Sequence, residues 1–197
     1  MLIYIHGFNS SPLSFKAALV RKRMVELARG REFVCPDLPD RPEQAIALLE
    51  GLLSENTESK PALIGSSLGG YYATYLAEKH GLRAALVNPA VRPYDLFEHA
   101  LGPQTNLYTG AQYVITGVHV SELRSLEVDS IHPERYLLVV RTGDEVLDYR
   151  DAVERYRGCE QIVEVGGDHG FSDFDRYLDS VLQFCGVPIP ASSGSPS

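Results

Sequence analysis

Ser67 stands between two glycines, each two positions away, in the segment 65–69, which reads GSSLG. Glycine at both positions removes the β-carbons that would block a tight turn from a strand into a helix. Such a turn lifts the central hydroxyl clear of the sheet and points the free N–H groups of the following helix at it. A plain structural turn is the alternative interpretation, whereas a phosphate-binding loop is disfavoured because no lysine follows. The pattern therefore predicts an exposed, nucleophilic serine.

A serine hydroxyl is a weak nucleophile at neutral pH, so it needs a general base, and the base needs an orienting carboxylate. Both residue types follow apolar runs further along the chain: Asp144 comes after residues 136–140, and His169 comes after residues 162–165. This order of serine, acid and histidine, each beyond the end of a strand, is typical of a catalytic triad on a parallel sheet. Glycines surround His169, which suits a loop that exposes an imidazole, although a surface loop histidine has the same surroundings.

Three further carboxylates compete with Asp144 for the role of the acid: Glu145, Asp148 and Asp151. We favour Asp144 because it is nearest to the end of the strand and directly follows a glycine. Asp148 is better placed to cap a helix that begins near Tyr149. The sequence thus predicts Ser67, Asp144 and His169 as the catalytic residues.

Acyl transfer also builds negative charge on a carbonyl oxygen, which preorganised backbone N–H groups must stabilise. The N–H of Leu68, one residue past the serine, is the first predicted donor. The second is expected from the loop after the first strand, where Gly7 allows a close approach, and Phe8 is the candidate. His6 is expected to brace this loop rather than to take part in catalysis.

The composition of the chain disfavours several other classes of protein. The chain has 197 residues, 44% of them hydrophobic, a formal charge of −8 and three cysteines without CxxC spacing. These values favour one globular domain and disfavour nucleic-acid binding, a disulfide framework and a zinc site. We expect no membrane span, because no apolar stretch approaches the roughly 20 residues that a bilayer helix needs. We expect no metal, because the histidines at 99, 119 and 132 lack ligand spacing, and no cofactor, because a serine triad needs none. The start of the chain has no signal-peptide pattern, which favours the cytoplasm.

Short β-rich runs alternate with helical patterns, which predicts an α/β fold with a parallel sheet. The expected strands are residues 2–5, 33–35, 62–64, 84–87, 136–140 and 162–165. The connection from the fourth to the fifth strand is far longer than a crossover needs, and it predicts a small helical cap inserted at about 90–134, with helices near 94–101 and 121–126. Residues 1–187 would form one domain, and residues 188–197, rich in Pro, Ser and Gly, a disordered tail.

Several longer segments make the chain similar to known proteins. They are residues 5–11 (IHGFNSS), 65–73 (GSSLGGYYA), 88–93 (NPAVRP), 142–149 (TGDEVLDY) and 166–169 (GGDH). With them the chain resembles the α/β-hydrolases, and more narrowly the small bacterial YqiA-like esterases. The resemblance extends from residue 1 to about residue 186.

The resemblance implies a three-layer fold and an esterase acting on short acyl esters, with acyl-CoA thioesters as a further substrate class. Ser67, Asp144 and His169 match the catalytic positions. The usual eight strands would be reduced to about six, in the order 2-1-3-4-5-6, because Ser67 follows the third strand and not the fifth. The competing hypothesis is a binding or sensing protein that keeps the fold without turnover, since a fold alone does not establish activity.

Overall fold

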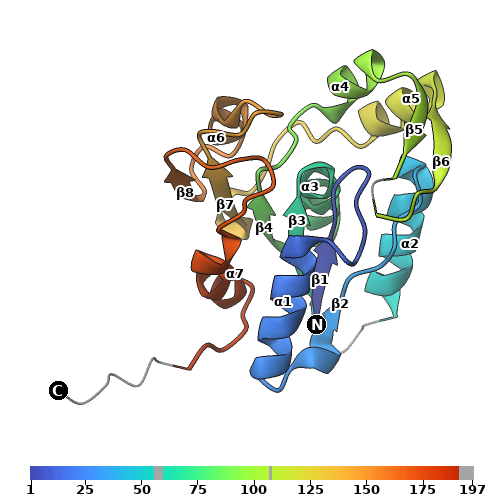
Figure 1. The fold of residues 1–197 in the computed structure, drawn as a ribbon. Helices are drawn as coiled ribbons and strands as arrows, with labels where there is room; N and C mark the ends of the chain where they lie inside the picture. The colour runs from blue at the N-terminus through green and yellow to red at the C-terminus, as the bar shows by residue number, and fades with distance from the viewer. Residues whose placement is uncertain (56–59, 107, 191–197) are drawn as a thin grey trace.

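The computed structural model describes residues 1–55, 60–106 and 108–190 (Figure 1). Of the predicted tail, residues 191–197 lie outside the described residues. Before them, Ile189 packs against the hydrophobic core and is partly buried.

A six-stranded sheet forms the centre of the molecule, and all of its strands are parallel. In spatial order they are β2 (Phe33–Val34), β1 (Leu2–Ile5), β3 (Ala62–Ser66), β4 (Arg83–Val87), β7 (Tyr136–Arg141) and β8 (Glu160–Glu164). The predicted fold class and strand order are confirmed. Since β3 is an inner strand, the residue that follows it lies near the middle of the sheet's carboxyl edge.

Helices cover both faces of the sheet because its strands are apolar on both sides. Along β1, Ile3 and Ile5 join one core cluster, whereas Leu2 and Tyr4 join the other, as the two-residue period of a strand requires. The helices of the first cluster include α2 (Pro42–Ser54), α3 (Leu68–His80) and α6 (Tyr149–Arg155). Those of the second are α1 (Phe15–Glu26) and α7 (Leu178–Phe184). Short 3-10 turns lie at η1 (Gly30–Glu32), η2 (Pro133–Arg135) and η3 (Phe174–Arg176).

The segment between β4 and β7 contains, besides η2, two helices and a hairpin that Figure 1 shows together at the top of the molecule. They are α4 (Pro93–His99), β5 (Gly102–Thr105), β6 (Gln112–Ile115) and α5 (Gly117–Ser125). The two helices lie close to where the sequence predicts them. The antiparallel β5–β6 hairpin was not predicted, because Gly102 and Pro103 disfavour a strand. We call this segment the insertion.

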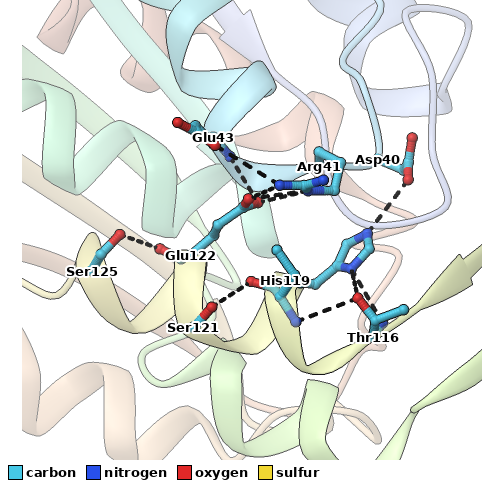
Figure 2. Close-up of polar contacts among 9 residues, drawn as sticks. Asp40, Arg41, Glu43, Thr116, His119, Ser121, Glu122 and Ser125 are labelled. Atoms are coloured by element: carbon cyan, nitrogen blue, oxygen red, sulfur yellow. Dashed lines mark hydrogen bonds and ion pairs between the residues drawn. The ribbon is translucent and has the colours of Figure 1, made fainter.

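Polar contacts fasten the insertion to the start of α2 (Figure 2). The Glu122 carboxylate pairs with the Arg41 guanidinium and accepts the N–H of Glu43 at 3.3 Å. One turn earlier on α5, the buried His119 has its Nε2 3.4 Å from Asp40, while its Nδ1 faces the Thr116 cap at 3.2 Å. These contacts hold α5 against the main domain.

Within the described ranges, no helix is both long enough and apolar enough to cross a membrane. The same residues contain no group of three or more His, Cys, Asp or Glu side chains placed to hold a metal ion.

Candidate active site

Ser67 occupies the sharp turn between β3 and α3, with φ 55° and ψ −123°. The left-handed φ is strained for serine and persists because the surroundings fix it. A β-carbon at Gly65 would lie 2.4 Å from the Gly69 carbonyl oxygen, and one at Gly69 would lie 2.0 Å from the Ile5 carbonyl oxygen. The two glycines of the motif are therefore required by close backbone contacts, as the sequence predicts.

The imidazole of His169 lies between the other two predicted catalytic side chains. Its Nε2 is 3.0 Å from Ser67 Oγ, and its Nδ1 is 2.8 Å from Asp144 Oδ2. In the tautomer that donates Nδ1–H to the carboxylate, Nε2 is free to accept the serine proton. The structure thus brings together three residues from the ends of β3, β7 and β8 in one continuous relay.

Asp144 is nearly enclosed, with a side chain that is 2% exposed. Burial alone would raise its pKa, but hydrogen bonds from His169 and from the N–H groups of Leu147 and Val146 outweigh this and lower the pKa below its usual value. The carboxylate is consequently ionised at neutral pH, as a partner for an imidazolium must be.

None of the three competing carboxylates contacts the imidazole ring. Glu145 accepts the backbone N–H of His169 at 2.9 Å, which positions the loop but not the ring. Asp148 caps α6 by accepting the N–H of Arg150 at 3.0 Å, as predicted. Asp151 lies within that helix, where its N–H donates to the Asp148 carbonyl.

Asn88 is a residue that the sequence reasoning did not assign to the site. Its side-chain N–H group donates to the carbonyls of Asp168 and His169, each at 3.2 Å, and its Oδ1 accepts the N–H of Arg141 at 2.9 Å. It is 3% exposed and has a positive φ of 40°. A polar residue directly after the apolar strand 84–87 was the available signal, but only the structure shows that it holds the histidine loop.

The loop after β1 lies against the nucleophile. A β-carbon at Gly7 would sit 3.0 Å from Ser67 Cβ, so a larger residue there would crowd the serine. His6 fixes this loop: its Nδ1–H donates to the Gly7 carbonyl at 3.0 Å and its Nε2 accepts the Leu38 N–H at 3.2 Å. Burial lowers the pKa of His6, which keeps it neutral for both bonds. This arrangement agrees with the predicted bracing role.

Two cavities flank the loop at residues 7–10. One, of about 340 Å3, is lined by Ser67, His169 and Gly7. The other, of about 230 Å3, is lined by Phe8 and Leu68, whose N–H groups are the predicted oxyanion donors. Phe8 lines both cavities, and Leu68 directly follows the serine in the chain; their role as oxyanion donors stays a prediction.

Aromatic residues of the insertion divide between two environments. Tyr94 and Phe97 are buried in the core, and the Phe97 ring packs edge-on against Phe8 at 4.9 Å. Tyr113 and Tyr108 instead line the two cavities. Tyr113 also donates its hydroxyl to Asn9 Oδ1 at 2.5 Å, which joins the hairpin to the loop after β1.

The parallel sheet, the strained serine turn and the placement of the serine, acid and histidine at strand ends define the α/β-hydrolase fold. The sequence of residues 1–186 matches the model of an uncharacterised protein family, UPF0227. The chain belongs to this family.

Relatives in the family are distant in sequence, but they match this chain over almost the whole length of both proteins. A UPF0227 protein of Citrobacter koseri is 23% identical over 186 residues, which cover 93% of this chain and 98% of that protein. The UPF0227 protein YcfP of Escherichia coli is 22% identical over the same coverage.

Solved structures with the same fold include Est1E from Butyrivibrio proteoclasticus, with a TM-score of 0.71 and 15% identity over 93% of this chain and 85% of that one. The monoacylglycerol lipase of Paleococcus ferrophilus has a TM-score of 0.64 and 16% identity, covering 93% of this chain and 94% of that one. At these identities, the likeness establishes the fold.

Proposed function

We propose that this protein is a serine hydrolase that cleaves carboxylic esters, and acyl thioesters by the same chemistry. One observation carries the proposal: the unbroken relay from Asp144 through His169 to Ser67, with distances of 2.8 Å and 3.0 Å. The esterase and lipase among the structural neighbours support the same class of reaction.

In this mechanism, His169 Nε2 takes the proton of Ser67 as the hydroxyl oxygen attacks the acyl carbon. Asp144 holds the ring in the required tautomer and stabilises the imidazolium that forms. The same Nε2–H then protonates the leaving alcohol or thiol as its bond to the acyl carbon breaks. Water, deprotonated by His169, finally releases the acid from the acyl-enzyme and restores Ser67.

The negative charge of each tetrahedral intermediate is assigned to the N–H groups of Phe8 and Leu68. Leu68 is the first residue of α3, so its N–H has no partner within the helix. Phe8 follows Gly7, whose lack of a side chain lets the loop lie close to the serine. Preorganised donors of this kind typically contribute the largest single part of catalysis in acyl transfer.

The insertion, in this proposal, acts as a cap that selects the acyl group. Its residues Tyr108 and Tyr113 line the cavities on the two sides of the loop after β1. The serine-lined cavity, at about 340 Å3, is at the lower end of the range of roughly 300–1,000 Å3 for small-molecule sites. Short acyl groups are therefore the expected substrates.

The test is hydrolysis of 4-nitrophenyl butyrate together with labelling by a fluorophosphonate probe. We expect Ser67→Ala to abolish labelling and to lower kcat by about 10³-fold or more. Ser121→Ala, on the exposed face of α5, should leave both the labelling and kcat unchanged. Labelling that persists in Ser67→Ala would contradict the nucleophile. Ester binding that raises the Tm of the wild type without any turnover would favour the binding-protein hypothesis.

A further inference from the structure

A lysine forms part of the wall of the serine-lined cavity. Lys16, near the start of α1, lies on that wall together with Ser67 and His169. Its Nζ donates to the Gly170 carbonyl at 2.7 Å, and Gly170 directly follows the histidine. An ammonium group carries three N–H donors, so two remain for a ligand in the cavity.

This cation has no anionic partner within ion-pair distance in the part of the chain that the structure describes. The two nearest carboxylates are engaged elsewhere: Asp144 with His169, and Asp168 with the Ser172 hydroxyl at 2.7 Å. Burial lowers the pKa of Lys16 to about 8, and Asp168 and Asp144 only partly oppose that effect. A partly buried charge without a counter-ion is costly unless a ligand pairs with it.

The position of Lys16 in its helix gives no separate reason for a cation. It lies in the first turn of α1, which contains no acidic residue, and a positive charge there opposes the helix dipole. Helix stability would thus favour a neutral or acidic side chain. The positive charge of Lys16 is therefore explained by a ligand in the cavity and not by the helix.

The two cavities beside the loop at residues 7–10 differ in charge. The one lined by Phe8 and Leu68 has two carboxylates on its wall, Asp37 and Asp40. The wall with Ser67 has no carboxylate among the described residues, and its rim includes the exposed rings of Phe15 and Tyr108. A substrate with both apolar and negatively charged parts fits the cavity lined by Ser67.

We propose that the enzyme prefers esters that carry a free carboxylate, which the Lys16 ammonium binds beside Ser67. A carboxylate matches the single charge of Lys16, whereas a doubly charged phosphate would be only half neutralised in a chain with a formal charge of −8. This inference rests on the proposed ester hydrolysis and specifies its substrate class.

The experiment compares two matched pairs of substrates. For a charge on the acyl side, 4-nitrophenyl hemiglutarate is compared with 4-nitrophenyl pentanoate. For a charge on the leaving group, 4-(butyryloxy)benzoate is compared with 4-methylphenyl butyrate. Each pair gives a ratio of kcat/KM for the charged over the neutral ester, measured for the wild type, Lys16→Met and Lys22→Met. Lys22 lies on the same helix and is exposed, so it controls for the change in net charge.

We expect the wild type to favour the carboxylate in one of the two pairs, which identifies the side of the substrate that Lys16 binds. Lys16→Met should lower that ratio about tenfold or more, the usual size of one charge-assisted contact, and Lys22→Met should not change it. The preference should also weaken as salt is added.

Ratios near unity in the wild type, or an equal loss on both members of each pair in Lys16→Met, would overturn the inference and leave Lys16 as a support for Gly170 alone. A wild type that hydrolyses none of the four esters would contradict the proposed function itself. Hydrolysis of the neutral esters therefore distinguishes a failure of the carboxylate preference from a failure of the proposed ester hydrolysis.

Discussion

Three groups position His169, and each holds a different part of the residue. Asp144 contacts Nδ1 of the ring, Glu145 accepts the backbone N–H, and Asn88 donates to the carbonyl. Because the ring and the backbone are fixed separately, the imidazole can transfer a proton without the loop moving. Glu145, the acid next to Asp144, thus supports the site through the backbone of His169 and not through its imidazole.

Replacing the two acids separates these roles. Asp144→Asn removes the charge that stabilises the imidazolium and the acceptor that fixes the tautomer, so kcat should fall by roughly 10³- to 10⁴-fold. Glu145→Gln keeps an oxygen that can accept the His169 N–H, and its kcat should fall less than about tenfold. Both values come from steady-state hydrolysis of 4-nitrophenyl butyrate, with the Tm confirming that each variant is folded. Equal losses in the two variants would show that the acid is wrongly assigned.

Residue types and chain order were sufficient to predict that Ser67, Asp144 and His169 lie together, because parallel strands bring their carboxyl ends to one edge. Neither Asn88 nor Lys16 could be assigned in the same way. Their contacts depend on how the end of β4 and the start of α1 face the loop after β8. That geometry comes from tertiary packing, which no local pattern encodes.

At the level of elements, the β5–β6 hairpin fixes the loop after β1 from outside. Asn9, which directly follows Phe8, has a positive φ of 52° and accepts the Tyr113 hydroxyl at 2.5 Å. The hairpin was missed in the sequence because its strands are short and half-exposed, and the first of them contains Gly102 and Pro103. Helix α3 begins at Leu68 although Gly69 and Gly70 disfavour a helix, because close packing against Ile5 and Pro89 requires both glycines.

Tyr113→Phe tests whether the hairpin positions the loop. Loss of the hydroxyl removes the bond to Asn9 and frees the N–H of Phe8 to move, so kcat/KM for 4-nitrophenyl butyrate should fall about three- to tenfold. Unfolding free energy should fall by about 1 kcal/mol, the usual value for one hydrogen bond. Tyr75→Phe on α3, whose hydroxyl accepts a hydrogen bond from Lys79 at 3.4 Å, is the matched control and should keep full activity. Unchanged kcat/KM in Tyr113→Phe would mean that the loop is held without the hairpin.

For the molecule as a whole, the sheet separates two cores that differ in their helices. Leu63 belongs to the cluster with α2, α3 and α6, and Leu137 to the cluster with α1 and α7. The two residues are on strands separated by β4, and both are almost fully buried. The apolar runs predicted the parallel sheet, since strands buried on both faces need such sequences, whereas the strand order was implied by the resemblance to the α/β-hydrolases.

Leu63→Ala and Leu137→Ala should each lower the unfolding free energy by about 2–5 kcal/mol, because each leaves a cavity in a closed core. Combined in one chain, the two losses should add to within about 0.5 kcal/mol, since the residues share no cluster. Urea unfolding followed by circular dichroism measures all three values. A coupling well above this limit would show that the two faces are not independent.

The insertion leaves the sheet after β4 and returns to it at β7, and these two strands are direct neighbours. Its length consequently has no effect on how the sheet pairs, while its aromatic residues form part of both cavities. A protein organised in this way has a modular specificity: exchanging one contiguous stretch of chain can redirect the enzyme to new compounds while the reacting groups stay in place. For protein engineering, residues 93–125 are therefore the part to diversify first, because this range leaves Asn88 and its contacts to the histidine loop unchanged.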